Sequence, residues 1–194
     1  MFLYALHYYY HMLSLSIIKV KQISKRKRMM FNKKLKHACK AYDKRLYLAY
    51  GSNLNVRQMA YRCPTARPVG AAMIYGWELC FRGVADIIKS SDPKMVLPVG
   101  IWEIEPADEY ALDAYEGYRP DTPSEGLYDK IKVAGIMTYQ MTRRDIAKPS
   151  QQYFNTILEG YHDFGLDTNY LLDAAGWAQY EEEQRDNVFG LEIA

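Results

Sequence analysis

The chain has 194 residues, and its 25 Lys and Arg and 23 Asp and Glu give a formal net charge of +2. That length suits one domain with a substantial core and is short for two. Residues 1–45 hold 12 basic residues and one acid, a net charge of +11, which leaves 13 basic and 22 acidic residues, a net charge of −9, for residues 46–194. The acidic balance of the larger part argues against nucleic acid as a ligand of the folded domain.

The first 45 residues form a basic N-terminal extension. Residues 1–18 carry no charged side chain and residues 19–28 are strongly basic, an order typical of a short signal anchor with a positive cytosolic flank. Histidine, serine and tyrosine side chains make residues 1–18 less hydrophobic than a typical anchor. The basic start and the cleavage site of a secretory signal are missing. We favour translation from Met29 or Met30, with a disordered basic tail as the alternative, and expect membrane contact only if residues 1–28 are expressed as an anchor.

The cysteines give no sign of a metal site or a disulfide framework. Cys39, Cys63 and Cys80 show no C-x-x-C spacing, and His7 and His11 have no third ligand nearby. An odd number of scattered cysteines suits a reducing compartment, so we expect a cytoplasmic protein without a cofactor.

The apolar, aromatic run Leu46–Tyr50 predicts a buried strand, which Gly51-Ser52-Asn53 interrupts. Residues 55–62 then have helical character until Pro64 ends it. A strand that turns into a helix leaves backbone N–H groups unpaired, and such a turn can hold a carboxylate or an oxyanion. The simpler interpretation is a strand end with a glycine turn and an asparagine cap.

A second informative segment follows strands expected at Trp77–Arg82 and Val99–Glu103. A helix is predicted to start near Pro106 and to end at Gly117, which places Glu116 in its last turn between two tyrosines. A helix C-terminus does not help a carboxylate and aromatic neighbours reduce its solvation, so the pKa of Glu116 should be raised toward the range useful for proton transfer. A solvated glutamate at a helix end is the alternative.

Both segments resemble a known family. Tyr50-Gly51-Ser52-Asn53-Leu54 is similar to the signature of the gamma-glutamylcyclotransferases, where it opens the fold and binds the glutamyl group. Leu112-Asp113-Ala-Tyr-Glu116-Gly117 is similar to the family's Leu-Asp-x-x-Glu-Gly stretch, whose glutamate is the catalytic acid/base. The resemblance therefore implies that role for Glu116.

Three further segments extend the resemblance in the same order along the chain. The resemblance implies pocket tyrosines at Tyr128, Tyr139 and Tyr153, although most of the 18 tyrosines must pack or lie on the surface. The tight connection around Ala134-Gly135 departs from the longer hairpin that is frequent in the family. The substrate-binding residues implied are Tyr47, Tyr50, Gly51, Ser52, Asn53, Leu54, Tyr128, Tyr139 and Tyr153.

The C-terminal part is expected to be helical. A helical face from Tyr153 ends at Gly165, a second helix covers Asp167–Tyr180, and residues 181–194 form a solvated acidic tail. With strands in close antiparallel succession, we expect an α+β domain over residues 46–180: a small mixed, mainly antiparallel β-barrel flanked by helices, like that of the gamma-glutamylcyclotransferases.

The resemblance implies conversion of an L-gamma-glutamyl amino acid, peptide or amine to 5-oxoproline and a free amine. One alternative is a serine hydrolase that uses Ser52, but the second glycine of G-x-S-x-G is missing and His162 is the only histidine of the domain that could act as its base. The other alternative is a non-catalytic module that binds an acidic metabolite. A like charge at Glu116 would only weaken such binding.

Overall fold

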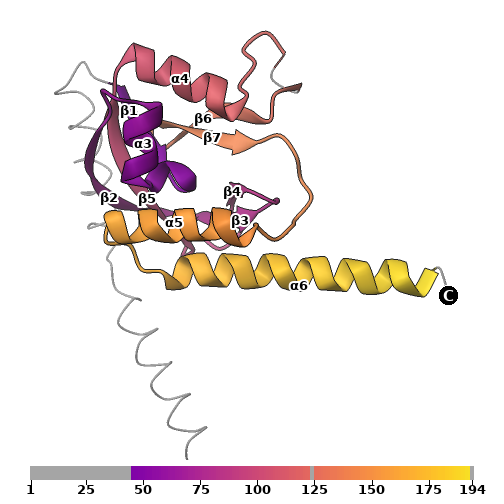
Figure 1. Cartoon of the computed structure of the whole chain (residues 1–194). Helices are drawn as coiled ribbons and strands as arrows, with labels where there is room; N and C mark the ends of the chain where they lie inside the picture. Colours follow the sequence, from indigo (N-terminus) through magenta and orange to yellow (C-terminus); the bar gives the residue numbers. More distant parts are fainter. Residues whose placement is uncertain (1–44, 123–124, 193–194) are drawn as a thin grey trace, which may run out of the picture. The chain divides into compact units, whose positions relative to one another are not determined.

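The protein is seen here as a computed structural model that describes residues 45–122 and 125–192, with side chains described up to residue 186. The predictions for residues 1–44 lie outside the described residues. The described part is an α+β fold with a mainly antiparallel sheet (Figure 1), which confirms the predicted class.

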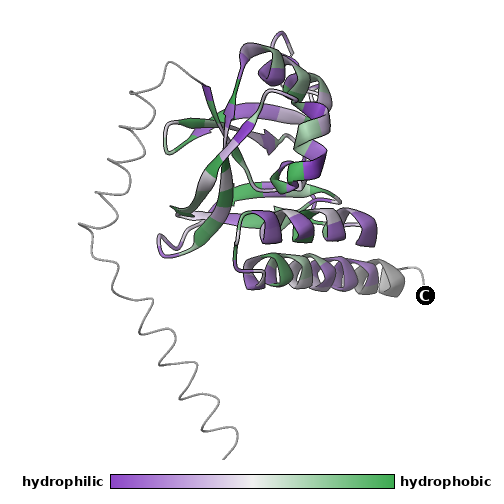
Figure 2. Cartoon of the chain, turned by 60° about the vertical axis from the view of Figure 1, so that its left-hand side comes forward, coloured by the Kyte–Doolittle hydropathy of each residue, from purple (hydrophilic) through white to green (hydrophobic). Residues whose placement is uncertain are grey.

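A five-stranded sheet organises the fold in the order β2-β5-β1-β7-β6. Strand β1 pairs parallel with β7, whereas the β1–β5, β2–β5 and β6–β7 pairs are antiparallel. Most of the buried hydrophobic residues lie in strands, and Figure 2 shows hydrophobic residues along them. Their bounds are Arg45–Ala49 for β1, Arg67–Tyr75 for β2, Val96–Ile104 for β5, Tyr128–Val133 for β6 and Ile136–Met141 for β7.

Two further strands, β3 (Trp77–Phe81) and β4 (Ala85–Lys89), form a separate antiparallel hairpin. The expected barrel is not confirmed, because the described strands form an open sheet and this hairpin rather than one closed ring. Sequence reasoning also missed β2 and β4 altogether.

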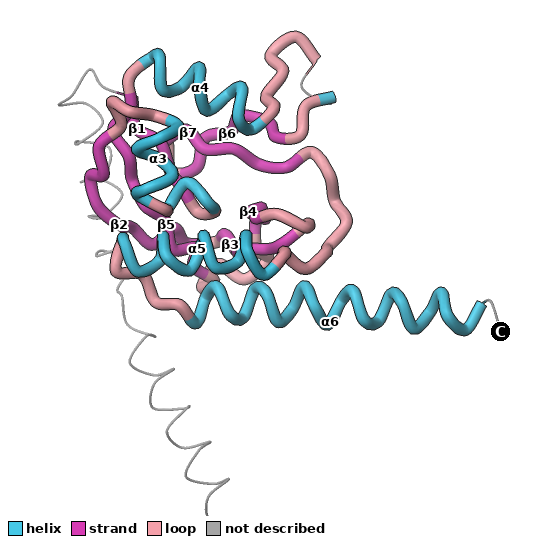
Figure 3. Tube along the Cα trace, in the orientation of Figure 1, coloured by secondary structure: helices cyan, strands magenta, loops and turns pink. Residues whose placement is uncertain are grey.

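Helices cover the sheet and connect its strands. The described helices are the 3-10 helix η1 (Ser52–Leu54), α3 (Val56–Arg62), α4 (Pro106–Glu116), α5 (Gln151–Asp163) and α6 (Asn169–Glu192). Helices α5 and α6 lie side by side (Figures 1 and 2), and a long loop joins β7 to α5 (Figure 3). Helix α6 extends well beyond the expected end at Tyr180, so much of the predicted tail is helical.

Local sequence explains the ends of the elements next to the site. The side chain of Asn55 accepts a hydrogen bond from the amide of Gln58 and caps α3. Helix α4 begins with Pro106 inside a capping box and ends at Gly117, whose φ of 64° is the left-handed conformation that glycine adopts easily. Ala134 and Gly135 have φ of 53° and 87°, so the β6–β7 connection is the tight turn that the sequence predicts.

Close packing by two glycines holds η1 in place. A Cβ atom at Gly160 of α5 would lie 2.5 Å from the Cβ of Leu54 and 2.7 Å from the amide nitrogen of Asn55. A Cβ at Gly100 of β5 would lie 2.8 Å from both Leu54 and Phe164. The turn between β1 and α3 is therefore clamped between the sheet and α5.

Candidate active site

A cavity of about 240 Å³ opens at the turn between β1 and α3. Its walls come from β1, η1, α4, β6, β7, α5 and the residues around the start of β4, so segments distant in sequence meet there. The lining residues are Tyr47, Tyr50, Gly51, Ser52, Asn53, Val84, Ala85, Tyr115, Glu116, Leu127, Tyr128, Tyr139 and Tyr153.

The structure brings together nearly all of the residues singled out from the sequence. The exception is Leu54, which does not line the cavity. Its side chain is fully buried against Gly100 and Gly160 and helps to fix η1. Leu54 is therefore part of the packing behind the turn, and its predicted contact with a ligand is not supported.

Glu116 lies at the end of α4 with its carboxyl turned toward η1. The side-chain amide of Asn53 donates a hydrogen bond to Glu116 Oε1 at 2.8 Å. Burial raises the pKa of the Glu116 carboxyl to about 7, although the Asn53 hydrogen bond and the positive charge of Arg62 both favour the ionised form. The direction agrees with the sequence-based expectation, and the group can exchange a proton near neutral pH.

Gly51 and Ser52 form the floor of the cavity beside Tyr153. A Cβ at Gly51 would lie 3.0 Å from the Ala85 Cβ and 3.3 Å from the Tyr153 hydroxyl, so only glycine fits here without displacement. The amides of Ser52 and Asn53 belong to the first turn of η1, where no preceding turn supplies acceptors. They are candidate donors to an anion in the cavity.

The cavity tyrosines are held by hydrogen bonds to other parts of the fold. The Tyr50 hydroxyl donates to the Tyr139 carbonyl at 2.8 Å, and the Tyr128 hydroxyl donates to the Ala85 carbonyl at 2.6 Å. The Tyr153 hydroxyl accepts a hydrogen bond from the Ala85 amide at 3.2 Å. These contacts fix the rings as walls of a shaped cavity.

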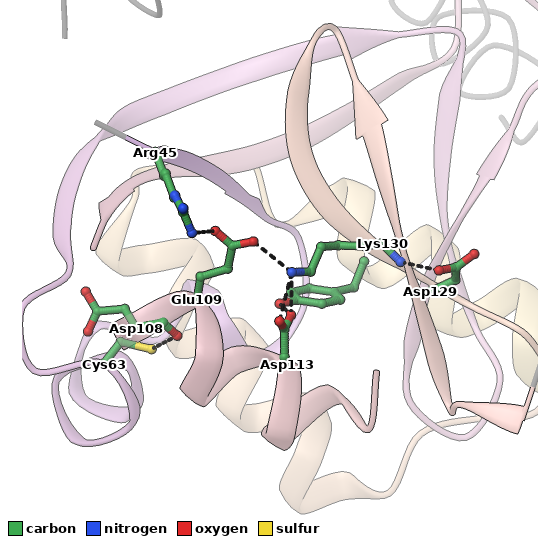
Figure 4. A network of polar contacts seen from close by, with 8 residues as sticks. Arg45, Cys63, Asp108, Glu109, Asp113, Asp129 and Lys130 are labelled. Carbon is green, nitrogen blue, oxygen red and sulfur yellow. Dashed lines mark hydrogen bonds and ion pairs between the residues drawn. The ribbon is translucent and has the colours of Figure 1, made fainter. Parts of the chain in front are cut away.

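Tyr139 is held by an ionic cluster behind the cavity. Its hydroxyl donates to Asp113 Oδ1 at 2.6 Å, and Lys130 Nζ donates to Asp113 at 2.8 Å and to Glu109 at 2.7 Å. Figure 4 shows Glu109 and Asp113 of α4 pointing toward Lys130, with Arg45 on the far side of Glu109. The cluster ties α4, which carries Glu116, to β1 and β6.

Sequence reasoning missed several residues of the site. Val84, Ala85, Tyr115 and Leu127 also line the cavity. Of these, Tyr115 and Leu127 have a sequence signal, because they directly precede the predicted site residues Glu116 and Tyr128. Arg62 was missed as well, although it lies behind Asn53 and Tyr115 and contacts both. Its position at the end of α3, nine residues after Asn53, gives no hint of that contact.

Comparisons with known proteins show what the chain resembles in sequence and fold. A curated gamma-glutamylcyclotransferase from Bos taurus is 28% identical over 146 residues, which cover 64% of this chain and 74% of that protein. A solved gamma-glutamyl cyclotransferase structure superposes with a TM-score of 0.58 at 26% identity, over 68% of this chain and 86% of its own. The chain is gamma-glutamylcyclotransferase-like in sequence and fold.

A further solved structure has a similar fold, but its name states no activity. A crystal structure of an uncharacterized protein from Homo sapiens is similar at a TM-score of 0.58 and 27% identity, over 69% of this chain and 87% of its own. No protein-family model matches the chain. The resemblance predicted from the two gamma-glutamylcyclotransferase-like motifs is thus confirmed.

The described residues contain neither a candidate metal site nor a candidate membrane span. Within residues 45–122 and 125–192, no group of histidine, cysteine and acidic side chains is arranged to hold a metal ion. No helix in the same part of the chain is long and apolar enough to cross a membrane.

Proposed function

We propose that the protein is a gamma-glutamylcyclotransferase that releases 5-oxoproline and a free amine from an L-gamma-glutamyl compound. The observation that carries this proposal is a single carboxyl group, that of Glu116, in a cavity otherwise lined by uncharged residues. It is the only acidic or basic residue among the described residues that line the cavity, and its pKa of about 7 suits both uptake and return of a proton. The similarity to proteins named gamma-glutamylcyclotransferase supports the same assignment.

The reaction needs no nucleophile from the protein. The Glu116 carboxylate takes a proton from the substrate's α-ammonium group, and the freed nitrogen attacks the γ-carbonyl carbon. A new C–N bond closes the five-membered ring as the carbonyl oxygen becomes an oxyanion. The bond to the leaving nitrogen then breaks as the carbonyl re-forms, and Glu116 returns its proton to that nitrogen. The ring nitrogen still carries two hydrogens and loses one of them to the departing amine or to water, which leaves neutral 5-oxoproline lactam and the ammonium form of the amine. One carboxyl group therefore serves both steps.

The other cavity residues bind and orient the substrate. The amides of Ser52 and Asn53 are proposed to hold the α-carboxylate or the γ-oxyanion. The fixed rings of Tyr47, Tyr50, Tyr128, Tyr139 and Tyr153 fold the glutamyl chain so that its amine faces its own γ-carbonyl. Such preorganisation is worth most in an intramolecular reaction, because only the folded conformer can react.

The serine hydrolase alternative lacks support in the cavity. His162, the only histidine in the described part of the chain, is exposed on α5 and does not line the cavity. Ser52 Oγ instead accepts a hydrogen bond from Arg62 at 3.2 Å. A pure binding module would gain nothing from the buried carboxyl of Glu116, because its charge would repel an acidic ligand.

The proposal is tested with a panel of gamma-glutamyl amino acids, glutathione and gamma-glutamyl amines. We expect the protein, acting in the cytoplasm without a cofactor, to release 5-oxoproline from at least one of them, as detected by mass spectrometry. The preferred compound then identifies the amine half of the substrate. Absence of 5-oxoproline from the whole panel would leave the binding-module alternative.

Ser52→Ala is expected to reduce turnover by about 10–1,000-fold, the range for loss of one donor to an oxyanion-type site. The Ser52 hydroxyl lines the cavity and accepts a hydrogen bond from Arg62, which leaves its own hydrogen to donate to the bound anion beside the backbone amides. The change removes this hydroxyl donor, while the backbone amides stay. Ser91→Ala, in an exposed loop, is the matched control and should leave turnover unchanged. Covalent labelling of Ser52 by a serine-directed inhibitor would contradict this role and favour the hydrolase.

The raised pKa of Glu116 also predicts how stability depends on pH. Between an unfolded pKa near 4.5 and a folded pKa of about 7, the folded state binds more protons at Glu116 than the unfolded state does. The contribution of Glu116 to the free energy of unfolding therefore falls as pH rises through this window. Glu116→Gln should match the wild type at pH 4 and exceed it by about 3 kcal/mol at pH 8, measured by urea unfolding. Equal stabilities at pH 8 would contradict the raised pKa.

A further inference from the structure

We propose that Arg62 is a positioning residue that fixes the Asn53 side chain so that its amide donates to Glu116. Arg62 does not line the cavity, so it acts on a bound substrate through the residues that it positions and not by direct contact. The inference rests on the proposed function for its kinetic consequence. Its structural consequence, on the titration of Glu116, can be measured without any activity.

The hydrogen bonds form a continuous chain from α3 to α4. Arg62 Nη1 donates to Asn53 Oδ1 at 2.6 Å and to Ser52 Oγ at 3.2 Å. Asn53 Nδ2 in turn donates to the Tyr47 hydroxyl and to Glu116 Oε1, both at 2.8 Å. Both hydrogens of the Asn53 amide are used, and its oxygen faces the guanidinium.

The guanidinium determines which way the Asn53 amide points. An amide turned by 180° would place its oxygen against the Glu116 carboxylate and its NH₂ group against Arg62, which has donors only. With Arg62 present, that orientation is electrostatically unfavourable on both sides. Without Arg62, only the contact with Glu116 still selects the orientation, and the preference of the amide for it becomes weaker.

Arg62 is itself held firmly enough to act in this way. Its Nη2 donates to Gln58 Oε1, one turn earlier on α3, and to the Tyr115 hydroxyl at 2.6 Å. Its guanidinium carbon lies 3.8 Å from the centre of the Tyr115 ring, a cation–π geometry. Because Tyr115 lines the cavity, Arg62 supports two of the residues around Glu116.

The groups that face Glu116 allow the effect of Arg62 to be isolated. Tyrosines approach it from β1, β6, β7 and α5 and from the turn after β1. Burial raises the pKa of each of them, so none ionises near pH 7; they are Tyr47, Tyr50, Tyr128, Tyr139 and Tyr153. Asn53 and Arg62 are the groups that favour the carboxylate form of Glu116. Loss of Arg62 removes its charge and loosens the Asn53 hydrogen bond, and both changes shift the titration midpoint of Glu116 upward.

The experiment is a ¹³C NMR titration of the glutamate carboxyl groups in the labelled full chain, with the Glu116 signal assigned by its absence in Glu116→Gln. Arg62→Met keeps the apolar stem of the side chain and removes its donors. We expect its Glu116 midpoint to rise by about one pH unit relative to the wild type. Arg57→Met, an exposed position on the same helix, loses the same charge and should leave the midpoint unchanged.

A second comparison separates positioning from direct charge. If Arg62 acts through Asn53, Arg62→Met should shift the midpoint much less in an Asn53→Ala background than in the wild type. An unchanged midpoint in folded Arg62→Met, or an equal shift in both backgrounds, would overturn the proposal. If Arg62→Met does not fold, Arg62→Gln is titrated in its place, and the same two outcomes would overturn the proposal.

The kinetic consequence follows from the same geometry. We expect Arg62→Met to lower kcat by about 10–100-fold, because misdirection of a catalytic group by a fraction of an ångström costs that much. The acid limb of its pH–rate profile should move upward together with the NMR midpoint. If the wild type forms no 5-oxoproline but the midpoint still depends on Arg62, the proposed function fails and the positioning role stands.

Discussion

Glu116→Gln is expected to abolish nearly all formation of 5-oxoproline, by about 10²–10⁴-fold, while the protein folds normally. Glutamine keeps the shape of the side chain and can still pair with Asn53, but it can neither take a proton from the substrate's ammonium nor return one to the leaving nitrogen. Binding of gamma-glutamyl ligands should persist. The measurement is the initial rate of 5-oxoproline release beside a thermal melt.

Glu125→Gln is the matched control for this prediction. Glu125 is exposed and lies 3.5 Å from Arg119 in a surface ion pair, so its replacement should leave the rate unchanged. Near-wild-type turnover by well-folded Glu116→Gln would contradict the mechanism. Loss of activity in Glu125→Gln instead would move the acid/base role to that residue.

Gly160→Ala is expected to destabilise the protein by about 1–3 kcal/mol, although alanine is normally the better helix former. The new Cβ would lie 2.5 Å from the Leu54 Cβ and 2.7 Å from the Asn55 amide nitrogen. Helix α5 and η1 must move apart to relieve this contact. Because η1 carries Ser52 and Asn53, turnover should fall as well. Urea unfolding and the 5-oxoproline assay measure the two effects.

Gly176→Ala provides the opposite expectation on the neighbouring helix. A Cβ at Gly176 of α6 would meet no atom within 4 Å, so the change should stabilise the protein by up to about 1 kcal/mol and leave turnover unchanged. Stabilisation by Gly160→Ala as well would show that α5 and η1 are not in close contact.

Local sequence rules predicted the elements that carry the site. The apolar run before Gly51 is strand β1, and the helix from Pro106 ends at Gly117 as expected. These elements have strong start and stop signals within the segment itself. Strand β2 was missed because its first five residues are exposed and include Pro68 and Gly70, so no alternating pattern appears.

The end of α6 was not predicted as a helix. The acidic run there reads as a solvated tail, yet glutamate, glutamine and arginine are good helix formers.

Contacts between distant segments could not be predicted from local sequence. Leu54 belongs to the motif of the resemblance, but packing of Gly100 and Gly160 turns it into the core. Arg62 meets Tyr115 only because α3 and α4 fold together across 53 positions of sequence.

The most direct test of the account is the identity of the product formed in ¹⁸O-labelled water from the best compound of the gamma-glutamyl panel. Intramolecular attack by the substrate's amine, with Glu116 carrying the proton, predicts 5-oxoproline without any ¹⁸O, together with the free amine. An analogue with an acetylated α-amine should give no product, because its nitrogen cannot attack. Glutamate that carries ¹⁸O, from either compound, would show attack by water and contradict the cyclisation.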